Sequence, residues 1–340
     1  MEPILQVRDL HTSFMTSNGE VHAVRGVSFN VEKGKTLGIV GESGSGKSVT
    51  SLSILKLLGT TGRVTAGSIK LGGEELTGKS RKEMRAIRGA RIAMIFQDPM
   101  TSLNPLIPMG EQVGEMLWEH NRSMSKAERQ QKVLELFRMV RIPEPEKRLK
   151  SYPHEFSGGM RQRVMIAMAL ACKPELLIAD EPTTALDVSI QDQILKLMRA
   201  LQREMGMSIM FITHDLGVVA ELCDRVAVMY GGLLMEEADI VDIFKRPMHP
   251  YTLGLMASIP DMNQDKHVKL QPIPGSPPDM IHPPKGCPFA PRCPYAMRVC
   301  MEEIPPYAVT GENRRSMCWL LDPEAPAAGN PFRQGREAAV

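Results

Sequence analysis

The stretch of sequence that decides the fold is Gly41-Glu42-Ser43-Gly44-Ser45-Gly46-Lys47-Ser48. It follows the apolar run Thr36–Val40 and precedes a helical pattern over residues 49–58. In this strand–loop–helix context, the pattern G-x-x-x-x-G-K-[ST] lets backbone N–H groups wrap a phosphate at a helix N-terminus. Lys47 can reach the β- and γ-phosphates, and the Ser48 hydroxyl can ligate Mg²⁺. The candidate phosphate-binding residues are Gly41, Ser43, Gly44, Gly46, Lys47, Ser48 and Val49.

An acidic pair follows a second apolar run, over residues 176–179. Asp180 is placed to hold Mg²⁺, and Glu181 is a candidate to polarise an attacking water. Neighbouring side chains of a strand point to opposite faces, so the two can serve one site only if the chain bends between them. Pro182 ends the strand directly afterwards. Together with the phosphate loop, the pair predicts a site for a nucleotide and its cation.

A second anion site is predicted at Ser157-Gly158-Gly159, which opens a helical pattern that runs to Cys172. Ser157 is a good N-cap, and the two glycines leave the first N–H groups of the helix exposed. One chain thus carries two features that bind phosphate.

The composition agrees with a folded enzyme and excludes several other classes. The chain has 340 residues, a length that allows about two domains, with 43% hydrophobic and 24% charged residues. Its 41 Lys+Arg and 39 Asp+Glu leave a net charge of +2, so nucleic acid is not the default partner. No uncharged run reaches the about 20 apolar residues of a membrane span, and residues 1–6 lack the features of a secretory signal.

Short apolar runs alternate with amphipathic stretches over residues 1–246, which predicts an α/β domain with a largely parallel sheet. Residues 106–155 show helical patterns without strong strands, so we expect an inserted helical subdomain there. Expected strands cover residues 5–7, 27–31, 36–40, 92–96, 176–179, 208–212 and 225–229. Expected helices cover residues 47–58, 110–121, 125–140, 158–172, 189–205 and 215–222.

The prolines mark a change of architecture, because 17 of the 26 fall after residue 246. We therefore divide the chain into residues 1–246 and a second module over residues 247–340. Prolines break helical and strand periodicity alike, so this module needs another source of order. Four of the six cysteines crowd into it, in the order Cys287, Cys293, Cys300 and Cys318.

These four cysteines have the spacing C-x₅-C-x₆-C-x₁₇-C. Four thiolates can ligate a [4Fe–4S] cluster or Zn²⁺, although zinc commonly uses tighter C-x₂₋₄-C pairs. Two disulfides are disfavoured in a chain without an export signal. Cys172 and Cys223 lie in apolar surroundings and are interpreted as core residues.

Taken together, the phosphate loop, the acidic pair and the Ser157-Gly158-Gly159 segment resemble the motifs of the ATP-binding subunits of ABC transporters. The family signature is L-S-G-G-Q, and here Phe156 and Met160 replace its first and last residues. The resemblance implies ATP and Mg²⁺ as cofactors and a P-loop fold. That fold has a RecA-like core, an antiparallel β subdomain and an inserted helical subdomain, here with a small proline- and cysteine-rich C-terminal extension.

The resemblance also implies roles for further residues. Gln97 matches the glutamine that touches Mg²⁺ or water, and Asp187 matches the D-loop in Ala185-Leu186-Asp187. His214 matches the switch histidine at the γ-phosphate, and Phe14 is the candidate to stack on adenine. The implied catalytic residues are Glu181, His214 and Gln97, and the implied Mg²⁺ ligands are Ser48, Gln97 and Asp180. The resemblance implies that two such chains close head to tail, so that Ser157, Gly158 and Gly159 of one cap the ATP bound to the other.

Residues 97–105, 246–252 and 272–278 and the four cysteines resemble the ATPases of oligopeptide/dipeptide importers. The resemblance implies a peripheral subunit on the cytoplasmic face of the inner membrane, where it couples ATP hydrolysis to peptide uptake. The implied partners are a second homologous ATPase, two transmembrane permease subunits and an extracytoplasmic peptide-binding protein. The resemblance also favours the iron–sulfur cluster over Zn²⁺ at the four cysteines.

Two other functions are compatible with some of these motifs. A soluble ABC-type ATPase of DNA repair or translation usually has a coiled-coil insertion or two fused halves, whereas this chain has one set of motifs and no basic stripe. An iron–sulfur electron-transfer protein needs a route from the cluster to an acceptor, and the cysteines lie far along the chain from the phosphate loop. An importer of another cargo, such as nickel chelates, stays open because other subunits select the cargo.

Overall fold

The computed structural model describes residues 2–98, 102–184, 186–258 and 272–333. Pro99, Met100 and Thr101 of the 97–105 motif, and Ala185 of the D-loop motif, lie outside these residues. The chain forms two compact units. The first unit contains residues 1–6, 30–36 and 70–212, and the second unit contains residues 7–29, 37–69 and 213–340. Each unit combines three segments of the chain, so the units do not correspond to the sequence ranges 1–246 and 247–340. The division of the chain at residue 247 stays a prediction.

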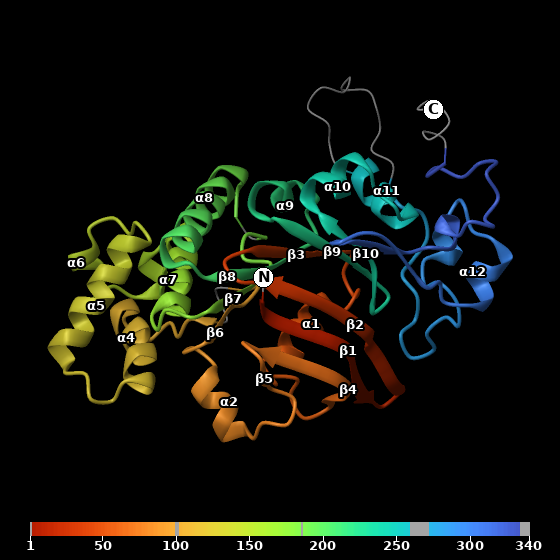
Figure 1. The fold of residues 1–340 in the computed structure, drawn as a ribbon. Helices are drawn as coiled ribbons and strands as arrows, with labels where there is room; N and C mark the ends of the chain where they lie inside the picture. The colour runs from red at the N-terminus through yellow and green to blue at the C-terminus, as the bar shows by residue number, and fades with distance from the viewer. Residues whose placement is uncertain (1, 99–101, 185, 259–271, 334–340) are drawn as a thin grey trace. The chain divides into compact units, whose positions relative to one another are not determined.

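Three parallel strands lie side by side in the first unit (Figure 1): β6 (Ile92–Ile95), β7 (Leu176–Asp180) and β8 (Ser208–Thr213). In the centre, Leu176 pairs with Ile92 on one side and with Ser208 on the other. Every residue of β7 and β8 is buried, as expected for parallel strands with both faces covered. Their apolar runs predicted these strands to within one residue at each end.

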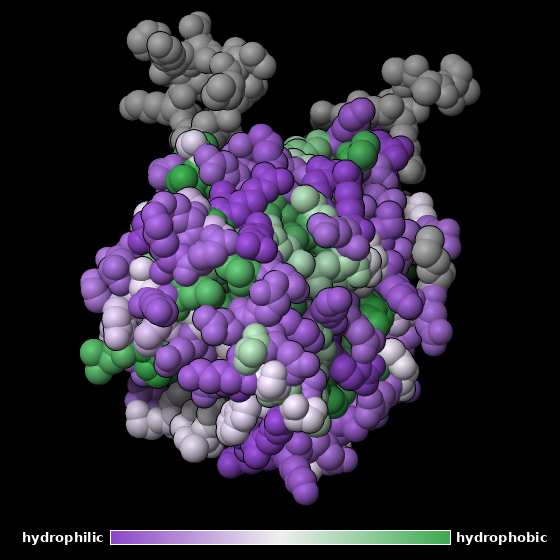
Figure 2. Space-filling model, turned by 90° about the vertical axis from the view of Figure 1, so that its left-hand side faces the viewer, coloured by the Kyte–Doolittle hydropathy of each residue, from purple (hydrophilic) through white to green (hydrophobic). Residues whose placement is uncertain are grey.

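The helices of the first unit include several within residues 106–155, where the sequence predicts helices without strong strands. The helices of this unit are α2 (Arg81–Ile87), α4 (Met109–His120), α5 (Lys126–Met139), α6 (Pro145–Arg148), η1 (Pro153–Glu155), α7 (Gly158–Leu170) and α8 (Val188–Met205). Helices α4, α5 and α7 pack against one another. Helix α5 begins at a capping box in which Ser125 and Glu128 satisfy each other's backbone N–H groups, which fixes its start. On the face shown in Figure 2, hydrophobic patches lie among mostly hydrophilic side chains.

The sheet of the second unit has the strand order β11-β12-β10-β9-β3. Strand β3 (Thr36–Val40) runs parallel to β9 (Arg225–Tyr230), whereas β10 (Leu233–Asp239), β12 (Arg314–Met317) and β11 (Tyr307–Gly311) are antiparallel to their neighbours. A second, antiparallel sheet joins β2 (Gly19–Glu32), β1 (Pro3–Thr16) and β4 (Gly62–Leu71), with β5 (Glu74–Glu75) at the end of β4.

The helices of the second unit are short: α1 (Lys47–Ile54), α9 (Leu216–Leu222), α10 (Ile240–Lys245), α11 (Pro250–Ala257), η2 (Ala290–Arg292), α12 (Arg298–Glu302) and η3 (Trp319–Leu321). Helix α1 ends four residues earlier than predicted, since Lys56 takes a left-handed backbone conformation with φ 51°, which an α-helix excludes. Within the described residues, no helix has the length and apolar character needed to cross a membrane.

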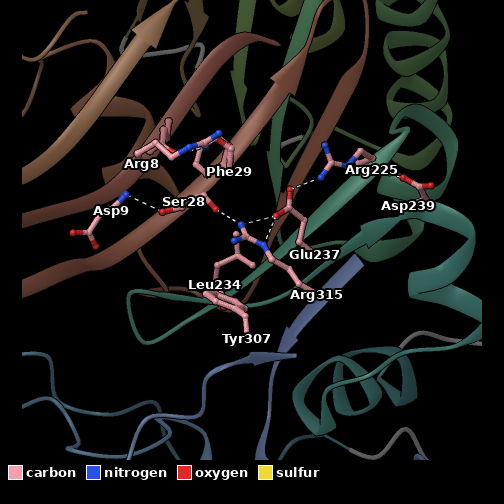
Figure 3. Close-up of polar contacts among 11 residues, drawn as sticks. Arg8, Asp9, Ser28, Phe29, Arg225, Leu234, Glu237, Asp239, Tyr307 and Arg315 are labelled. Atoms are coloured by element: carbon pink, nitrogen blue, oxygen red, sulfur yellow. Dashed lines mark hydrogen bonds and ion pairs between the residues drawn. The ribbon is translucent and has the colours of Figure 1, made fainter. Parts of the chain in front are cut away.

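The proline-rich module contains more regular structure than the sequence predicted. Strands β11 and β12 form a hairpin that extends the sheet at β10, so strand pairing supplies part of the order that this module needs. A buried ion network secures the hairpin (Figure 3). Glu237 of β10 is 3% exposed and accepts from Arg225 Nη2 at 2.6 Å and from Arg315 Nη2 of β12 at 2.7 Å. The Arg315 guanidinium also lies over the ring of Tyr307, 4.6 Å from its centroid, and donates to the Ser28 carbonyl.

Glu237 is the counter-ion that Arg225 and Arg315 share, and all three side chains are mostly buried. Removing its charge leaves both arginines without this partner. Loss of one member of a buried ion pair costs about 3 kcal/mol. We therefore expect Glu237→Gln to lower the free energy of unfolding by about 3 kcal/mol in urea denaturation. The matched control is Glu302→Gln, which removes an exposed partner of Arg298 and should leave stability unchanged. Equal stability of the two variants would contradict the role assigned to the network.

Candidate functional site

The phosphate loop joins β3 to α1 in the second unit and takes a shape that requires glycine. Gly41 has φ +154° and Gly46 has φ +102°, a region that L side chains rarely adopt. A Cβ on Gly41 would lie 2.1 Å from the Met229 carbonyl oxygen, and one on Gly46 would lie 2.5 Å from the Ala23 carbonyl oxygen. The loop backbone therefore passes directly against β9 and β2. Ser43 and Gly44 of the loop are exposed to solvent.

Lys47 is folded back over this loop. Its side chain is 5% exposed, and Nζ donates to the carbonyl oxygens of Gly41 at 2.7 Å and Glu42 at 2.9 Å. Ser48 and Val49 continue the first turn of α1 and are half-buried. The ammonium group is thus held over the curve of the loop, where a bound phosphate group would meet both the charge and the backbone N–H groups.

A carboxylate cluster lies at the end of β7 in the first unit. Asp180 is buried as the last residue of the strand. Glu181 has φ +46°, and its N–H donates to the Ile212 carbonyl of β8 at 2.9 Å. Its Oε2 accepts from Gln97 Nε2 at 3.1 Å and from Thr184 Oγ1 at 3.0 Å.

The positive φ of Glu181 shows that the chain departs from strand geometry directly after Asp180. Such a conformation at a residue other than glycine costs of order 1–3 kcal/mol and is concentrated at functional sites. Gln97 and Glu181, which are 84 residues apart, are brought into direct contact. Of the residues expected to be catalytic, these two belong to one cluster of the first unit.

The predicted second anion site and the D-loop lie together in the first unit. Ser157 caps α7, with Oγ accepting from the Met160 N–H at 3.3 Å. Asp187 caps α8, with Oδ1 accepting from the Ile190 N–H at 2.9 Å. A Cβ on Gly159 would lie 2.6 Å from Ile190 Cγ2, so this glycine allows the two helix starts to approach closely.

The two departures from the signature have different surroundings. Phe156 is buried, so an apolar residue in place of leucine serves packing below the helix start. Met160 is half-buried and contributes its backbone N–H to the Ser157 cap, a contact that does not depend on its side chain. Neither change removes the serine or the glycines that the anion site uses.

His214 and Phe14 belong to the second unit. His214 is exposed directly after β8, and the following Asp215 caps α9 through the Gly217 N–H at 2.7 Å. Phe14 is half-buried in β1, and its ring edge leaves no room for a side chain at Gly62. Phe14 and His214 belong to the second unit, whereas Gln97 and Glu181 belong to the first.

Contacts of Glu42 were not anticipated from the sequence. This loop residue binds Arg292 and Tyr251 of the C-terminal region. No motif signals these partners, which lie more than 200 residues further along the chain.

Comparison with known proteins decides the family. The model "ABC transporter" matches residues 24–184, and the model "Oligopeptide/dipeptide transporter, C-terminal region" matches residues 235–300. A dipeptide transport ATP-binding protein of Bacillus subtilis is 54% identical, covering 96% of this chain and 97% of the relative. The chain belongs to the ATP-binding proteins of the oligopeptide/dipeptide ABC transporter family. It is an ABC-type ATPase, as the order of its motifs predicted.

Further relatives agree with this family. The oligopeptide transport ATP-binding protein of Salmonella typhimurium is 50% identical over 93% of each chain. Among solved structures, the ATP-binding cassette MJ0796, a dimer bound to ADP and Pi, matches with a TM-score of 0.63 at 29% identity, covering 69% of this chain and 98% of that one. The cassette cbiO1 of Clostridium perfringens matches with a TM-score of 0.62. The fold predicted from the sequence, a P-loop ABC ATPase with a C-terminal extension, is confirmed.

The close approach at Gly41 leads to a graded prediction for ATP binding. Gly41→Ala combines an unfavourable φ with a clash against β9, so we expect the Kd for MgATP to rise more than about 10-fold. Gly44→Ala meets only the φ cost, because a Cβ there contacts nothing within 4 Å, and should raise Kd about 5-fold. Gly78→Ala, in open space on the surface, is the control. Calorimetric titration measures all three, and an unchanged Kd for Gly41→Ala would refute the assignment of this loop.

Proposed function

We propose that this ATPase drives the uptake of oligopeptides or dipeptides across a cytoplasmic membrane. The family supports a peptide transporter, and the cluster of Gln97, Thr184 and Glu181 beside Asp180 is the observation that carries the hydrolytic assignment. An exposed strand end that carried only surface charge would not need a left-handed glutamate held by two hydrogen bonds.

The phosphates of ATP bind the loop through Gly41, Ser43, Gly44, Gly46, Lys47, Ser48 and Val49. Backbone N–H groups and Lys47 supply the positive potential, and Phe14 stacks on the adenine. Ser48, Asp180 and Gln97 are the proposed Mg²⁺ ligands, and their oxygen atoms are the donors that this cation prefers. When bound, Mg²⁺ neutralises charge on the β- and γ-phosphates.

Glu181 orients and polarises the attacking water, and the Gln97 and Thr184 hydrogen bonds fix the direction of its carboxylate. His214 contacts the γ-phosphate. Phosphoryl transfer depends mainly on positioning and charge stabilisation, so a carboxylate held at the end of a rigid buried strand suits the task.

Ser157, Gly158, Gly159 and Asp187 serve the nucleotide that is bound to a second ATPase subunit. Their capped helix starts support this role, because an N-capped, glycine-rich helix start presents N–H groups to an anion. The similarity to a cassette that was solved as a dimer with ADP and Pi agrees with it. The proposed complex contains a homologous ATPase, two transmembrane permease subunits and an extracytoplasmic peptide-binding protein, with this chain peripheral on the cytoplasmic face of the inner membrane.

The four clustered cysteines are proposed to hold a [4Fe–4S] cluster, with Zn²⁺ as the alternative. Cys287, Cys293, Cys300 and Cys318 line one cavity, and each is a free thiol in the described structure. Burial, with a smaller contribution from neighbouring thiols, raises the pKa of Cys287 to about 12. No group of three or more His, Cys, Asp or Glu side chains among the described residues is arranged to hold a metal ion. The proposal therefore requires the thiols to draw together around the cluster.

Glu181→Gln should retain ATP binding and lose at least about 100-fold in turnover, because the amide cannot act as a base toward water. The measurement is the ATPase rate of the chain assembled with its membrane partners, with the Kd for MgATP measured in parallel. Glu204→Gln, an exposed glutamate on α8, is the matched control. Undiminished hydrolysis by Glu181→Gln in the assembled complex would remove Glu181 from the mechanism.

Anaerobic purification followed by iron, sulfide and zinc analysis tests the cysteine site. We expect about four iron and four sulfide per chain, and loss of both in Cys300→Ser. Cys172→Ser alters a cysteine outside the cavity and should keep the full iron content. Stoichiometric zinc without iron, or a metal-free protein, would overturn the cluster.

A further inference from the structure

Arg292 of the second unit makes five side-chain hydrogen bonds, and its partners tie three segments together. Its side chain is 6% exposed. Nη1 donates to Glu42 Oε2 at 2.6 Å and to the Tyr230 hydroxyl at 3.0 Å, and Nη2 donates to Glu42 Oε1 at 3.1 Å. Nη2 also donates to the Ile273 carbonyl at 3.0 Å, and Nε donates to the Pro274 carbonyl at 2.8 Å.

A guanidinium group carries five N–H donors, and Arg292 makes five hydrogen bonds. The two bonds to Glu42 form a bidentate pair, which fixes the plane of the carboxylate as well as its position. Lysine cannot reproduce this geometry. The pair therefore sets the orientation of Glu42 and does more than cancel its charge.

Glu42 is the second residue of the phosphate loop, and its backbone is held as firmly as its side chain. Its N–H donates to the Tyr251 hydroxyl at 2.8 Å, and its carbonyl oxygen accepts from Lys47 Nζ at 2.9 Å. Contacts from the C-terminal region thus reach the residue that positions the phosphate-binding lysine.

An aromatic cluster makes this attachment rigid. The rings of Tyr230 and Tyr251 have centroids 4.6 Å apart, and Phe289 lies 5.4 Å from the first and 5.2 Å from the second. Tyr230 and Phe289 meet edge to face, an arrangement that ring electrostatics favours. All three side chains are buried, so the hydroxyl groups that bind Glu42 and Arg292 have fixed positions.

The charge of Glu42 explains why the loop needs this partner. A carboxylate beside a loop that binds a polyanion repels the ligand, and at a partly buried group such as Glu42, whose side chain is 26% exposed, the repulsion is stronger than in bulk water. Arg292 compensates that charge in place.

We propose that Arg292 is a positioning residue for ATP: it neutralises Glu42 and holds the phosphate loop in its binding shape from the C-terminal region. This inference rests on the proposed nucleotide site at Lys47. It gives the C-terminal region a part in ATP binding that is separate from its cysteines.

The test is the Kd for MgATP of the purified full-length chain. Arg292→Met should raise Kd about 10-fold or more, because Glu42 then faces the phosphates uncompensated. Glu42→Gln/Arg292→Met removes the repelling charge as well and should restore Kd to within about 3-fold of the unmodified protein. If Arg292 had only a structural role, adding Glu42→Gln to Arg292→Met would not restore the Kd.

Arg298→Met is the matched control, because Arg298 lies six residues away, is 91% exposed and pairs only with Glu302 in the ion pairs of the described chain. Its Kd should not change. Where Arg292→Met does not fold, Arg292→Lys replaces it. Lysine keeps the charge and loses the bidentate bond, so we expect a Kd several-fold above that of the unmodified chain.

Lys47→Ala distinguishes a failure of the proposed nucleotide site from a failure of the role proposed for Arg292. If Lys47→Ala binds MgATP normally, the proposed nucleotide site itself is wrong. If Lys47→Ala loses binding while both Arg292 variants bind normally, or if the double variant binds no better than Arg292→Met, the role of Arg292 alone is refuted.

Discussion

The backbone at Gly41 and Gly46 passes so close to two carbonyl oxygens that no side chain fits at either position. Those oxygens belong to Met229 in β9 and Ala23 in β2, so the loop is fixed between the two sheets of the second unit. The direction of α1 follows from this, because the helix begins at the residue after Gly46. Lys47, at that first position, is then folded over the loop it stabilises. The chemistry that a phosphate requires thus depends on the absence of two Cβ atoms.

Much of the fold could be predicted from local patterns, since the central strands are continuous apolar runs and several helices begin at strong caps. The four-residue difference at the end of α1 arose because Lys56 carries no local signal for a left-handed conformation. Strand β10 was missed for a different reason. It contains Glu236 and Glu237, which are buried, whereas carboxylates in a sequence normally indicate an exposed surface. Glu237 is compensated by Arg315, and a partner 78 residues away leaves no trace in the pattern.

The candidate site also contains features that local sequence patterns indicate and contacts that they do not. The phosphate loop, the acidic pair and the N-capped glycines each have a short motif with a physical basis, so their residues could be proposed from the sequence. Strand geometry made a change of direction after Asp180 a condition for a shared site, and Glu181 has a positive φ at that point. The hydrogen bonds of Glu42 to Tyr251 and Arg292 could not be predicted, because neither partner belongs to a motif of the loop. Strands β11 and β12 were not predicted either, because their order comes from pairing and not from their own periodicity: β12 pairs with β10, and β11 pairs with β12.

The attachment of Glu42 to Arg292 has a consequence for biosynthesis. The two residues are 250 positions apart, and a ribosome adds about 5–20 residues per second. The phosphate loop therefore emerges roughly 13–50 seconds before the arginine that completes its set of contacts. During that interval the nascent chain carries the whole nucleotide motif without its final support. Acquisition of the finished loop is thus tied to synthesis of almost the entire chain, which delays the mature nucleotide site until the region that distinguishes this family has been made.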